Sequence, residues 1–452
     1  MQGKLPLPPK LRNAIGPSII LLGLGLGSGE LILWPYLVST YGLGIIWAAV
    51  VGITAQFFIN MEIERYSLLA GESIFAGFSR LSKKLPFWFI FSTFIAWIWP
   101  GIIATSAKIF STAFGFERFD LLAIALLVAI GLVLTLGPTL YRTVETFQKN
   151  LIMIGIPLIV IITLLLAKSA DFSALSKGLI GIGEGYRFLP SGISLFAFLG
   201  ALAYSGAGGN LNLAQSFYIK EKGYGMCAGL VGISSVLMRK AKEVRIFGQA
   251  ADFQDKENLS RFKKWWILTN AEHFLVFLFT GAITILFLAL LAYSSVKGIP
   301  SNQGIEFIAL EGKKIAEVIS PFIGALFLII VALMLFGTQL TVLDASSRII
   351  SENIVILKKS LNLSKTYYGV LWAQILAGIA IFLIGYTDPV SLVIVGAVIN
   401  AFAMFIHVAI TYLLNKKLLP LEYRPALWRK IILLVTWLFF GILGIMAIIN
   451  YF

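Results

Sequence analysis

The chain has 452 residues, of which 58% are apolar and 13% are charged, and its mean hydropathy is +0.90. Soluble domains carry about 25% charged and about 45–50% apolar residues, so the composition excludes water-soluble enzymes, disordered tails and DNA-binding proteins. The 36 lysines and arginines outnumber the 22 aspartates and glutamates, and in a membrane protein such an excess is typical of basic cytoplasmic loops. We therefore expect an all-α integral membrane protein.

Apolar stretches long enough to cross the bilayer recur along the whole sequence. A helix needs about 20 apolar residues to span ~30 Å of hydrocarbon. Eleven stretches qualify, near 14–40, 44–69, 86–114, 120–140, 146–167, 191–219, 266–294, 318–347, 366–386, 389–414 and 428–451. They predict one polytopic transport domain over residues 1–452. Between the seventh and eighth spans, apolar residues within 302–317 follow the period of a short amphipathic helix.

The positions of lysine and arginine predict the orientation. With the N-terminus in the cytoplasm, 28 of the 36 basic residues fall in inside loops and seven in outside loops. This asymmetry follows the positive-inside rule and accounts for the excess charge without a nucleic-acid partner. We expect a multi-pass protein of the cell membrane with an extracytoplasmic C-terminus. The lipid bilayer is the partner that the sequence indicates, and no protein partner is evident.

Two glycine-rich stretches interrupt otherwise apolar spans. Residues 23–30 of the first span and 204–212 of the sixth combine glycines with polar side chains at mid-membrane depth. Glycine weakens helix interiors, and an unwound backbone is tolerated in the membrane only where it lines a protein cavity. The sequence therefore predicts two helix breaks around an internal site, at Ser28, Gly29, Gly206, Gly208 and Gly209.

The two stretches also align with each other. Gly29-Glu30-Leu31 matches Gly209-Asn210-Leu211 at a spacing of 180 residues. Five spans separate the two stretches, so the halves of the chain have opposite topologies, and paired interrupted helices in inverted halves indicate a transport site at the midplane. We expect a first repeat over 14–167, a second over 191–414, and one extra C-terminal helix over 428–451.

These features resemble the Nramp family of metal transporters, within the larger group with a LeuT-like five-plus-five inverted repeat. The resemblance covers most of the chain and includes Gly16-Pro17 at the start of the first span, the two breaks, Gly337-Thr338-Gln339 in the eighth span and the segment 400–403 in the tenth. It implies broken first and sixth helices, a divalent metal and protons as cargo, and no enzymatic activity.

The chain departs from the family at the metal-binding positions. Gly27 stands where the family has aspartate, Glu30 where it has asparagine, Ala207 where it has methionine and Gly209 where it has histidine. The soft sulfur ligand is thus absent, and oxygen ligands suit Mg²⁺, Ca²⁺ and Mn²⁺. The third span also lacks the family's proton-relay carboxylates, so proton coupling does not follow from the resemblance.

We expect the site to hold a hard divalent cation as cargo, with no permanently bound cofactor. The predicted ligands are the Glu30 carboxylate, the carbonyls near Gly27 and Ala207, and the side-chain amides of Asn210, Gln339 and Asn400. Two alternatives stay open for individual residues. In the first, Glu30 is protonated or paired with a buried basic residue instead of binding a cation. In the second, Asn210 caps its own half-helix.

Three charged residues are candidates for gating or coupling. Asp344 and Arg348 are four residues apart in the eighth span and are expected to pair. Lys108 lies near the outer end of its span, where it extends toward the interface or supplies a fixed positive charge.

The predicted function is a secondary-active carrier of a hard divalent cation. A carrier of a small organic solute such as an amino acid and a passive cation channel are the alternative hypotheses. An enzymatic function is disfavoured because no candidate nucleophile has a general base placed to activate it. The single cysteine, Cys227, has no partner for an intramolecular disulfide.

Overall fold

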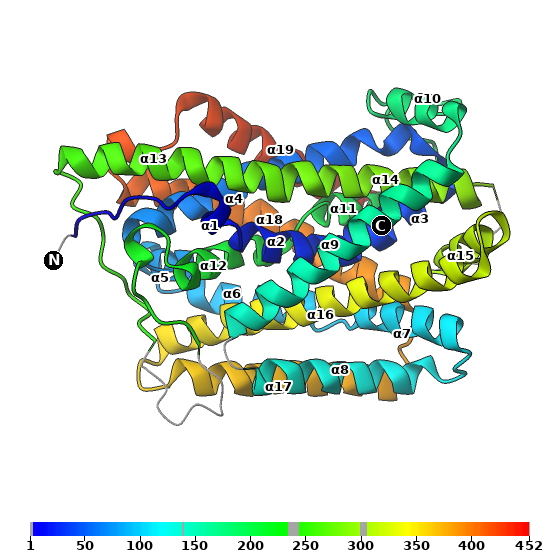
Figure 1. The fold of residues 1–452 in the computed structure, drawn as a ribbon. Coiled ribbons are helices and arrows are strands. Elements are labelled where there is room, and N and C mark those ends of the chain that lie inside the picture. The colour runs from blue at the N-terminus through cyan, green and yellow to red at the C-terminus, as the bar shows by residue number, and fades with distance from the viewer. Residues whose placement is uncertain (1–2, 138–139, 234–243, 299–304, 452) are drawn as a thin grey trace.

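A computed structural model of the protein describes residues 3–137, 140–233, 244–298 and 305–451. This part of the chain is helical, and its only β-type pairings are two isolated bridges, Gly3 with Ala251 and Ile182 with Arg187. The helices run roughly parallel to one long axis of the molecule (Figure 1). The expectation of an all-α protein is confirmed.

The first half of the chain supplies the helices of the first five predicted spans. These are α1 (Leu11–Ala14), α2 (Pro17–Gly25), η1 (Leu26–Leu33), α3 (Trp34–Tyr41), η2 (Leu43–Ile45), α4 (Trp47–Ala70), α5 (Ile74–Leu81), α6 (Leu85–Trp97), α7 (Gly101–Phe114), α8 (Phe119–Leu136) and α9 (Leu140–Leu166). Pro100 separates α6 from α7, because proline has no N–H to continue the helical hydrogen bonds.

The second half begins with a helix between spans, α10 (Ser169–Gly178). The remaining elements are α11 (Leu195–Ala203), η3 (Gly209–Ala214), α12 (Gln215–Lys222), η4 (Gly225–Cys227), α13 (Lys256–His273), η5 (Phe274–Phe279), α14 (Thr280–Val296), α15 (Glu306–Val318), α16 (Pro321–Leu357), α17 (Leu363–Leu383), α18 (Pro389–Leu418), η6 (Leu421–Tyr423) and α19 (Leu427–Tyr451). Helix α15 confirms the amphipathic helix expected between the seventh and eighth spans.

Ten helical stretches of the described residues are long and apolar enough to cross a membrane. They match ten of the eleven predicted spans. The sixth predicted span, 191–219, is instead two short helices, α11 and α12, on either side of a break, and neither reaches the length of a span. The count of eleven spanning helices is therefore not confirmed. The division into two inverted repeats stays a prediction.

The predicted break in the first span is wrong. Helices α2 and α3 are joined by η1, a π-helix, so Ser28 and Gly29 lie within a continuous helical stretch. A π-helix keeps its backbone hydrogen-bonded through i→i+5 pairs, so these glycines do not unwind the helix. Gly25 and Gly29 instead allow the first span to pack closely against the sixth segment. A Cβ on Gly25 would lie 2.9 Å from the Gly206 carbonyl carbon, and one on Gly29 would overlap the Tyr204 carbonyl.

The predicted break in the sixth span is confirmed. The helix α11 ends at Ala203, and residues 204–208 are not helical before η3 begins. Gly208 and Gly209 have φ angles of 76° and 55°, in the left-handed region that glycine adopts without steric cost.

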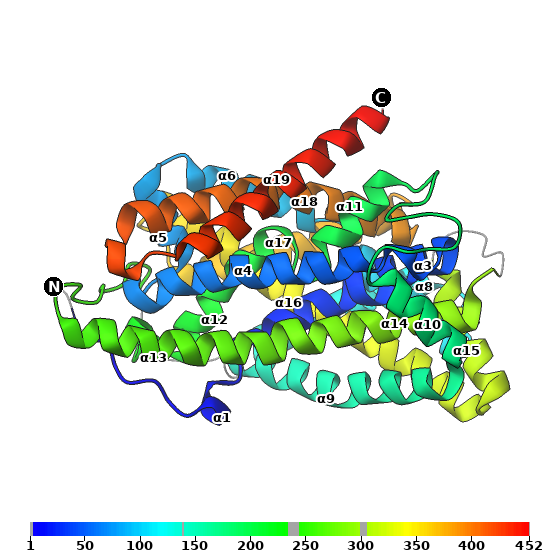
Figure 2. The same ribbon diagram turned by 90° about the horizontal axis from the view of Figure 1, so that it is seen from above.

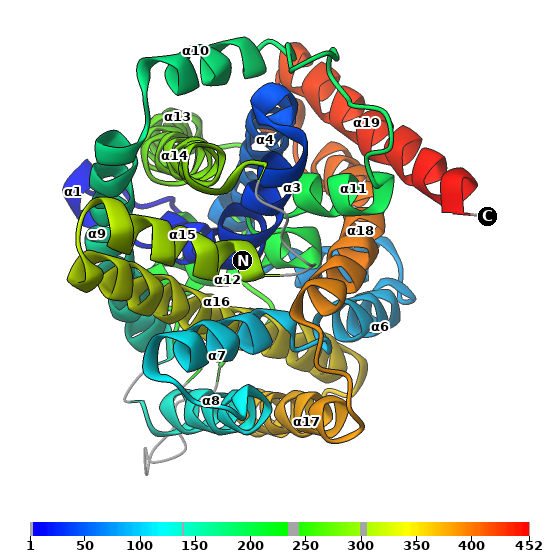
Figure 3. The same cartoon turned by 90° about the vertical axis from the view of Figure 1, so that its right-hand side faces the viewer.

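The first span and the broken sixth segment lie at the centre of the molecule. The view along the long axis shows α3, α11 and α12 inside a ring of longer helices, with α8 and α17 together on one side (Figure 3). The apolar 18-residue stretch of the first span is completely buried, whereas only 28% of the corresponding stretch of the last span is buried. Helix α19 lies on the periphery and slants away from the bundle toward the C-terminus (Figure 2).

Candidate functional site

The break in the sixth segment is held open by a glutamine from another helix. The Gln56 side chain of α4 donates from Nε2 to the Ala203 carbonyl (2.9 Å) and accepts at Oε1 from the Gly208 N–H (3.1 Å). Gln56 thus satisfies backbone groups that lose their helical partners at the break. All three groups are buried, so the contact defines the geometry of the break.

Two of the predicted asparagines lie at this break, and each is anchored through its nitrogen. The Asn210 Nδ2 donates to Ser92 Oγ (2.8 Å) and Thr93 Oγ1 (3.0 Å) of α6. The Asn400 Nδ2 donates to Tyr204 Oη (3.0 Å) and the Gly396 carbonyl (3.0 Å). These bonds fix the orientation of both amides.

The oxygens of the predicted amides remain unbonded. Asn210 Oδ1, Gln339 Oε1 and Asn400 Oδ1 are buried without a hydrogen-bond partner among the described residues. Asn400 lies directly over Gly209, since a Cβ at Gly209 would overlap its side chain. Gln339 follows Thr338, which donates to the Gly23 carbonyl (2.8 Å) of the first span. Buried polar atoms normally have partners, so each of these three acceptors is available to a ligand.

Glu30 is buried, and neither carboxylate oxygen has a hydrogen-bond partner in the described part of the chain. The Glu30 Oε1 atom lies next to Gly281 of α14: a Cβ atom added to this glycine would be 3.5 Å from it. Gly27 instead faces α16, where its Cβ would lie 2.5 Å from Thr338 Cβ. The predicted ring of ligands is therefore not closed in this conformation, because the helix turns Gly27 and Glu30 toward different neighbours.

The remaining backbone ligand, Ala207, lies inside the break and is buried. The described residues contain no group of three or more histidine, cysteine, aspartate or glutamate side chains that could hold a metal. A cation at the break would therefore be bound mainly by amide and carbonyl oxygens.

The pairing of Asp344 with Arg348 is confirmed. Arg348 Nε lies 2.9 Å from Asp344 Oδ1, and both side chains are buried. Arg348 also pairs with Glu221 at the end of α12, and Tyr367 donates to Asp344 Oδ1 (2.7 Å). The sequence did not predict the last two contacts.

Lys108 does not reach the break. Its side chain is exposed at the surface, and its Nζ lies 4.8 Å from the centre of the Phe119 ring. The position agrees with a lysine that extends to the interface, and within the described part of the chain no hydrogen bond or ion pair connects it with the predicted ligands.

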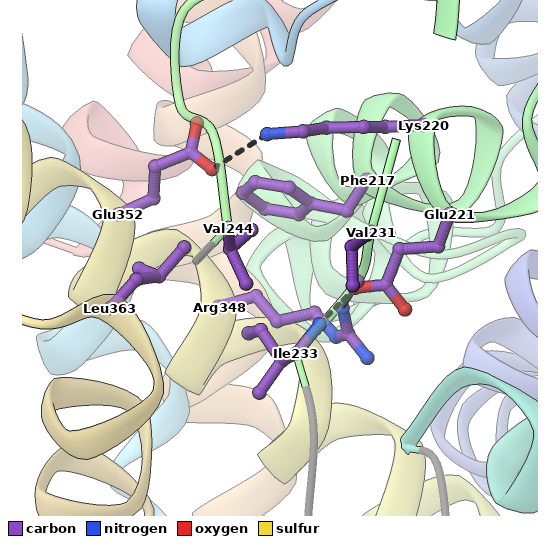
Figure 4. A pocket seen from close by; sticks show the side chains of 10 residues that line it. Phe217, Lys220, Glu221, Val231, Ile233, Val244, Arg348, Glu352 and Leu363 are labelled. Carbon is purple, nitrogen blue, oxygen red and sulfur yellow. Dashed lines mark hydrogen bonds and ion pairs between the residues drawn. The ribbon is translucent and has the colours of Figure 1, made fainter. Parts of the chain in front are cut away.

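Three consecutive charged residues at the end of α12 tie the second half of the sixth segment, which the sequence predicts to be the inner half, to its neighbours. Lys220 pairs with Glu352 of α16 (3.8 Å) and Glu221 with Arg348, as the close view shows (Figure 4). Lys222 pairs with Glu145 of α9 (2.8 Å) and donates to the Ile15 carbonyl (3.0 Å). We call residues 220–222 with these partners the inner latch. It joins α12 to α16, α9 and the start of the first span.

Sequence reasoning missed Gln56 and the inner latch. The signal for Gln56 was present, because Gln56, Asn60 and Glu64 recur every fourth residue within an apolar span. The signal for the latch was the run of three charges directly after the sixth span. In both cases the partners are remote in sequence, so the contacts themselves could not be inferred.

The fold is similar to that of solved transporter structures over nearly the whole chain. A mutant of the manganese transporter of Eremococcus coleocola superposes with a TM-score of 0.72 at 13% sequence identity, covering 98% of this chain and 88% of that chain. The chain has the fold of this transporter. At this identity the likeness confirms the Nramp resemblance at the level of the fold.

Two further structures share the architecture more distantly. Mhp1, a nucleobase-cation-symport-1 family transporter with bromovinylhydantoin bound, gives a TM-score of 0.51 at 12% identity over 98% of this chain and 92% of that chain. MhsT in complex with L-phenylalanine gives 0.52 at 14% identity over the full length of both chains. No family model and no curated protein sequence matches the chain. These neighbours agree with a carrier rather than an enzyme.

Proposed function

We propose that the protein is a secondary-active carrier that moves a hard divalent cation of the Mg²⁺, Mn²⁺ or Ca²⁺ class by alternating access. The cargo is held at the break between α11 and η3. The observation that carries the proposal is the set of three buried, unbonded amide oxygens of Asn210, Gln339 and Asn400. Hard cations prefer such oxygen ligands.

The anchoring of the amides supports a cation rather than an anion. Because the nitrogens of Asn210 and Asn400 are engaged with α6, Tyr204 and Gly396, only their oxygens are available to a ligand. The carbonyls near Gly27 and Ala207 are the further proposed ligands. Glu30, which is buried in the same span as Gly27, supplies the negative charge that offsets a divalent cation.

The closed inner end supports alternating access. The inner latch joins α12 to α16 and α9 through ion pairs and to the start of the first span through a hydrogen bond, so release of cargo on that side requires these contacts to separate. Since most basic residues belong to the loops at the latch end, we place that end and the N-terminus in the cytoplasm.

Two other functions, an amino-acid carrier and a passive cation channel, make different predictions for binding and transport. An amino acid would bring a carboxylate, which Glu30 repels, and its ammonium group would compete for the amide oxygens. A passive cation channel would conduct ions without saturation. The proposal predicts saturable uptake with no single-channel conductance.

The test combines binding and transport. Purified protein is titrated calorimetrically with Mn²⁺, Mg²⁺, Ca²⁺ and a set of amino acids, and uptake of ⁵⁴Mn²⁺ is measured in proteoliposomes. We expect saturable binding of at least one divalent cation, and loss of binding and uptake in the Asn210→Ala and Asn400→Ala variants.

The matched control is Gln374→Ala. Gln374 is also a buried amide, but both of its ends are bonded, to Ser346 Oγ (2.9 Å) and Ser347 Oγ (2.8 Å). This variant should keep the affinity of the wild type. Binding of amino acids without cations, or equal loss in all three variants, would contradict the proposal.

A further inference from the structure

A stripe of polar side chains runs along α4 from the break toward the inner end. Gln56, Asn60 and Glu64 are spaced by four residues, which places them on one face of the helix. Gln56 binds the break, and Glu64 lies beside Gln215 at the start of α12. Asn60 therefore faces the segment between them, which is η3.

A second polar stripe on α18 faces the same segment. Asn400 lies over Gly209, and His407 and Thr411 follow it by seven and eleven residues, on the same face. At the inner end, Asn415 Nδ2 donates to the Glu62 carbonyl (2.9 Å) and brings α18 and α4 together. The two stripes thus enclose η3 and the start of α12.

The polar groups between these stripes have no partners in the described part of the chain. This holds for both polar side-chain atoms of Asn60, Asn212 and His407, and for Thr411 Oγ1, while Glu64 and Gln215 face each other and have no other hydrogen-bond partner. None of these residues is more than 1% exposed. Buried polar groups are normally hydrogen-bonded, and ordered water commonly supplies the partners of those that the protein leaves unbonded.

Among the described residues, Glu64 faces no free positive charge. Its neighbours from the elements packed around it are Glu272 of α13, which repels it, Gln215 of α12, and Tyr224 of the segment after α12. Lys222 is the basic group near Glu272, but it is engaged by Glu145 and the Ile15 carbonyl. The charged form of an isolated buried carboxylate is strongly unfavourable, and binding a proton removes that charge.

We propose that the stripes on α4 and α18 line a proton path from the break to the inner end of the molecule, and that Glu64 is its proton-binding residue. The proton moves along hydrogen-bonded water and side chains and leaves to water at the inner surface. The link between this path and transport rests on the proposed function, but the site itself does not.

The experiment is infrared difference spectroscopy of the full-length protein at neutral pH, in H₂O and after transfer to D₂O. We expect wild type to show the C=O band of a protonated buried carboxyl group, which is absent in Glu64→Gln and shifts in D₂O while the protein is folded. Glu311→Gln removes a buried carboxyl of α15, outside the path, and serves as the matched control that keeps the Glu64 band.

Two further variants test the route without changing Glu64. Asn60→Leu and His407→Leu should keep the band but slow its shift in D₂O several-fold. An unchanged spectrum in Glu64→Gln, or an unchanged exchange rate in both leucine variants, would overturn the inference. If Glu64→Gln does not fold, the leucine variants decide the question.

A last measurement separates this inference from the proposed function. Proton movement into proteoliposomes is followed with an internal pH dye during Mn²⁺ uptake. The inference predicts that Glu64→Gln loses proton movement and retains Mn²⁺ binding. Absence of Mn²⁺ binding in the wild type would refute the proposed function and leave the infrared result to decide on the proton site.

Discussion

Replacing Gln56 by leucine removes the side chain that bridges the break while keeping a similar volume. The substitution leaves the Ala203 carbonyl and the Gly208 N–H buried without their present partner. Each unsatisfied buried group costs about 1–3 kcal/mol, so we expect a loss of about 2–6 kcal/mol in the free energy of unfolding. The break should also lose its defined geometry, which weakens cargo binding.

The single cysteine provides the assay. Cys227 is completely buried and burial raises the pKa of its thiol to about 12, so the thiol reacts with a maleimide dye only when the protein unfolds. Thermal unfolding in detergent is followed by this reaction for wild type, Gln56→Leu and the control Gln374→Leu. The serine partners of Gln374 are hydroxyls that can bond to their own helix backbone, so this control should lose less stability.

The reasoning would be refuted if Gln56→Leu unfolded at the wild-type temperature and kept wild-type uptake. Equal losses in the Gln56 and Gln374 variants would show that any buried amide has this effect. A variant with wild-type stability but reduced uptake would leave the role in cargo binding and refute the energetic argument.

Gly29→Ala should abolish the folded protein, because the new Cβ would overlap the Tyr204 carbonyl. The control Gly369→Ala on α17 places its Cβ in open space and should be neutral or stabilise the protein by up to ~1 kcal/mol. Expression level and monodispersity of the purified variants check both expectations. Arg348→Gln leaves Asp344 and Glu221 without their cation and should open the inner end, measured as increased labelling of a cysteine introduced at position 218. Burial raises the pKa of Glu311 in α15, so the folded state binds the proton more tightly than the unfolded state. The stability contributed by this group is present in acid and is lost as the pH rises through the raised pKa, and Glu311→Gln should remove that part of the pH dependence of the unfolding temperature.

Local patterns in the sequence predicted the features whose causes are local. The pair Asp344 and Arg348 was predictable because residues four apart meet on a helix. The sixth break was predictable because Gly208 and Gly209 adopt backbone angles that other residues avoid. The ten confirmed spans follow from apolar length alone.

Features that depend on remote neighbours were not predictable. A glycine run fits both an unwound segment and a close helix contact, and only the positions of Tyr204 and Thr338 decide that the first span is continuous. The partners of Gln56 lie 147 and 152 residues away. The direction of Glu30 depends on the π-helical turn, which has no sequence signature here.

The most direct test of the account is the location of Mn²⁺ by anomalous scattering in crystals of the protein grown with the ion. The account predicts one strong peak at the break, within ligand distance of the side-chain oxygens of Asn210, Gln339 and Asn400, and its loss in Asn400→Ala crystals. An empty break with Mn²⁺ bound elsewhere, or a peak that persists in Asn400→Ala, would contradict the central claim.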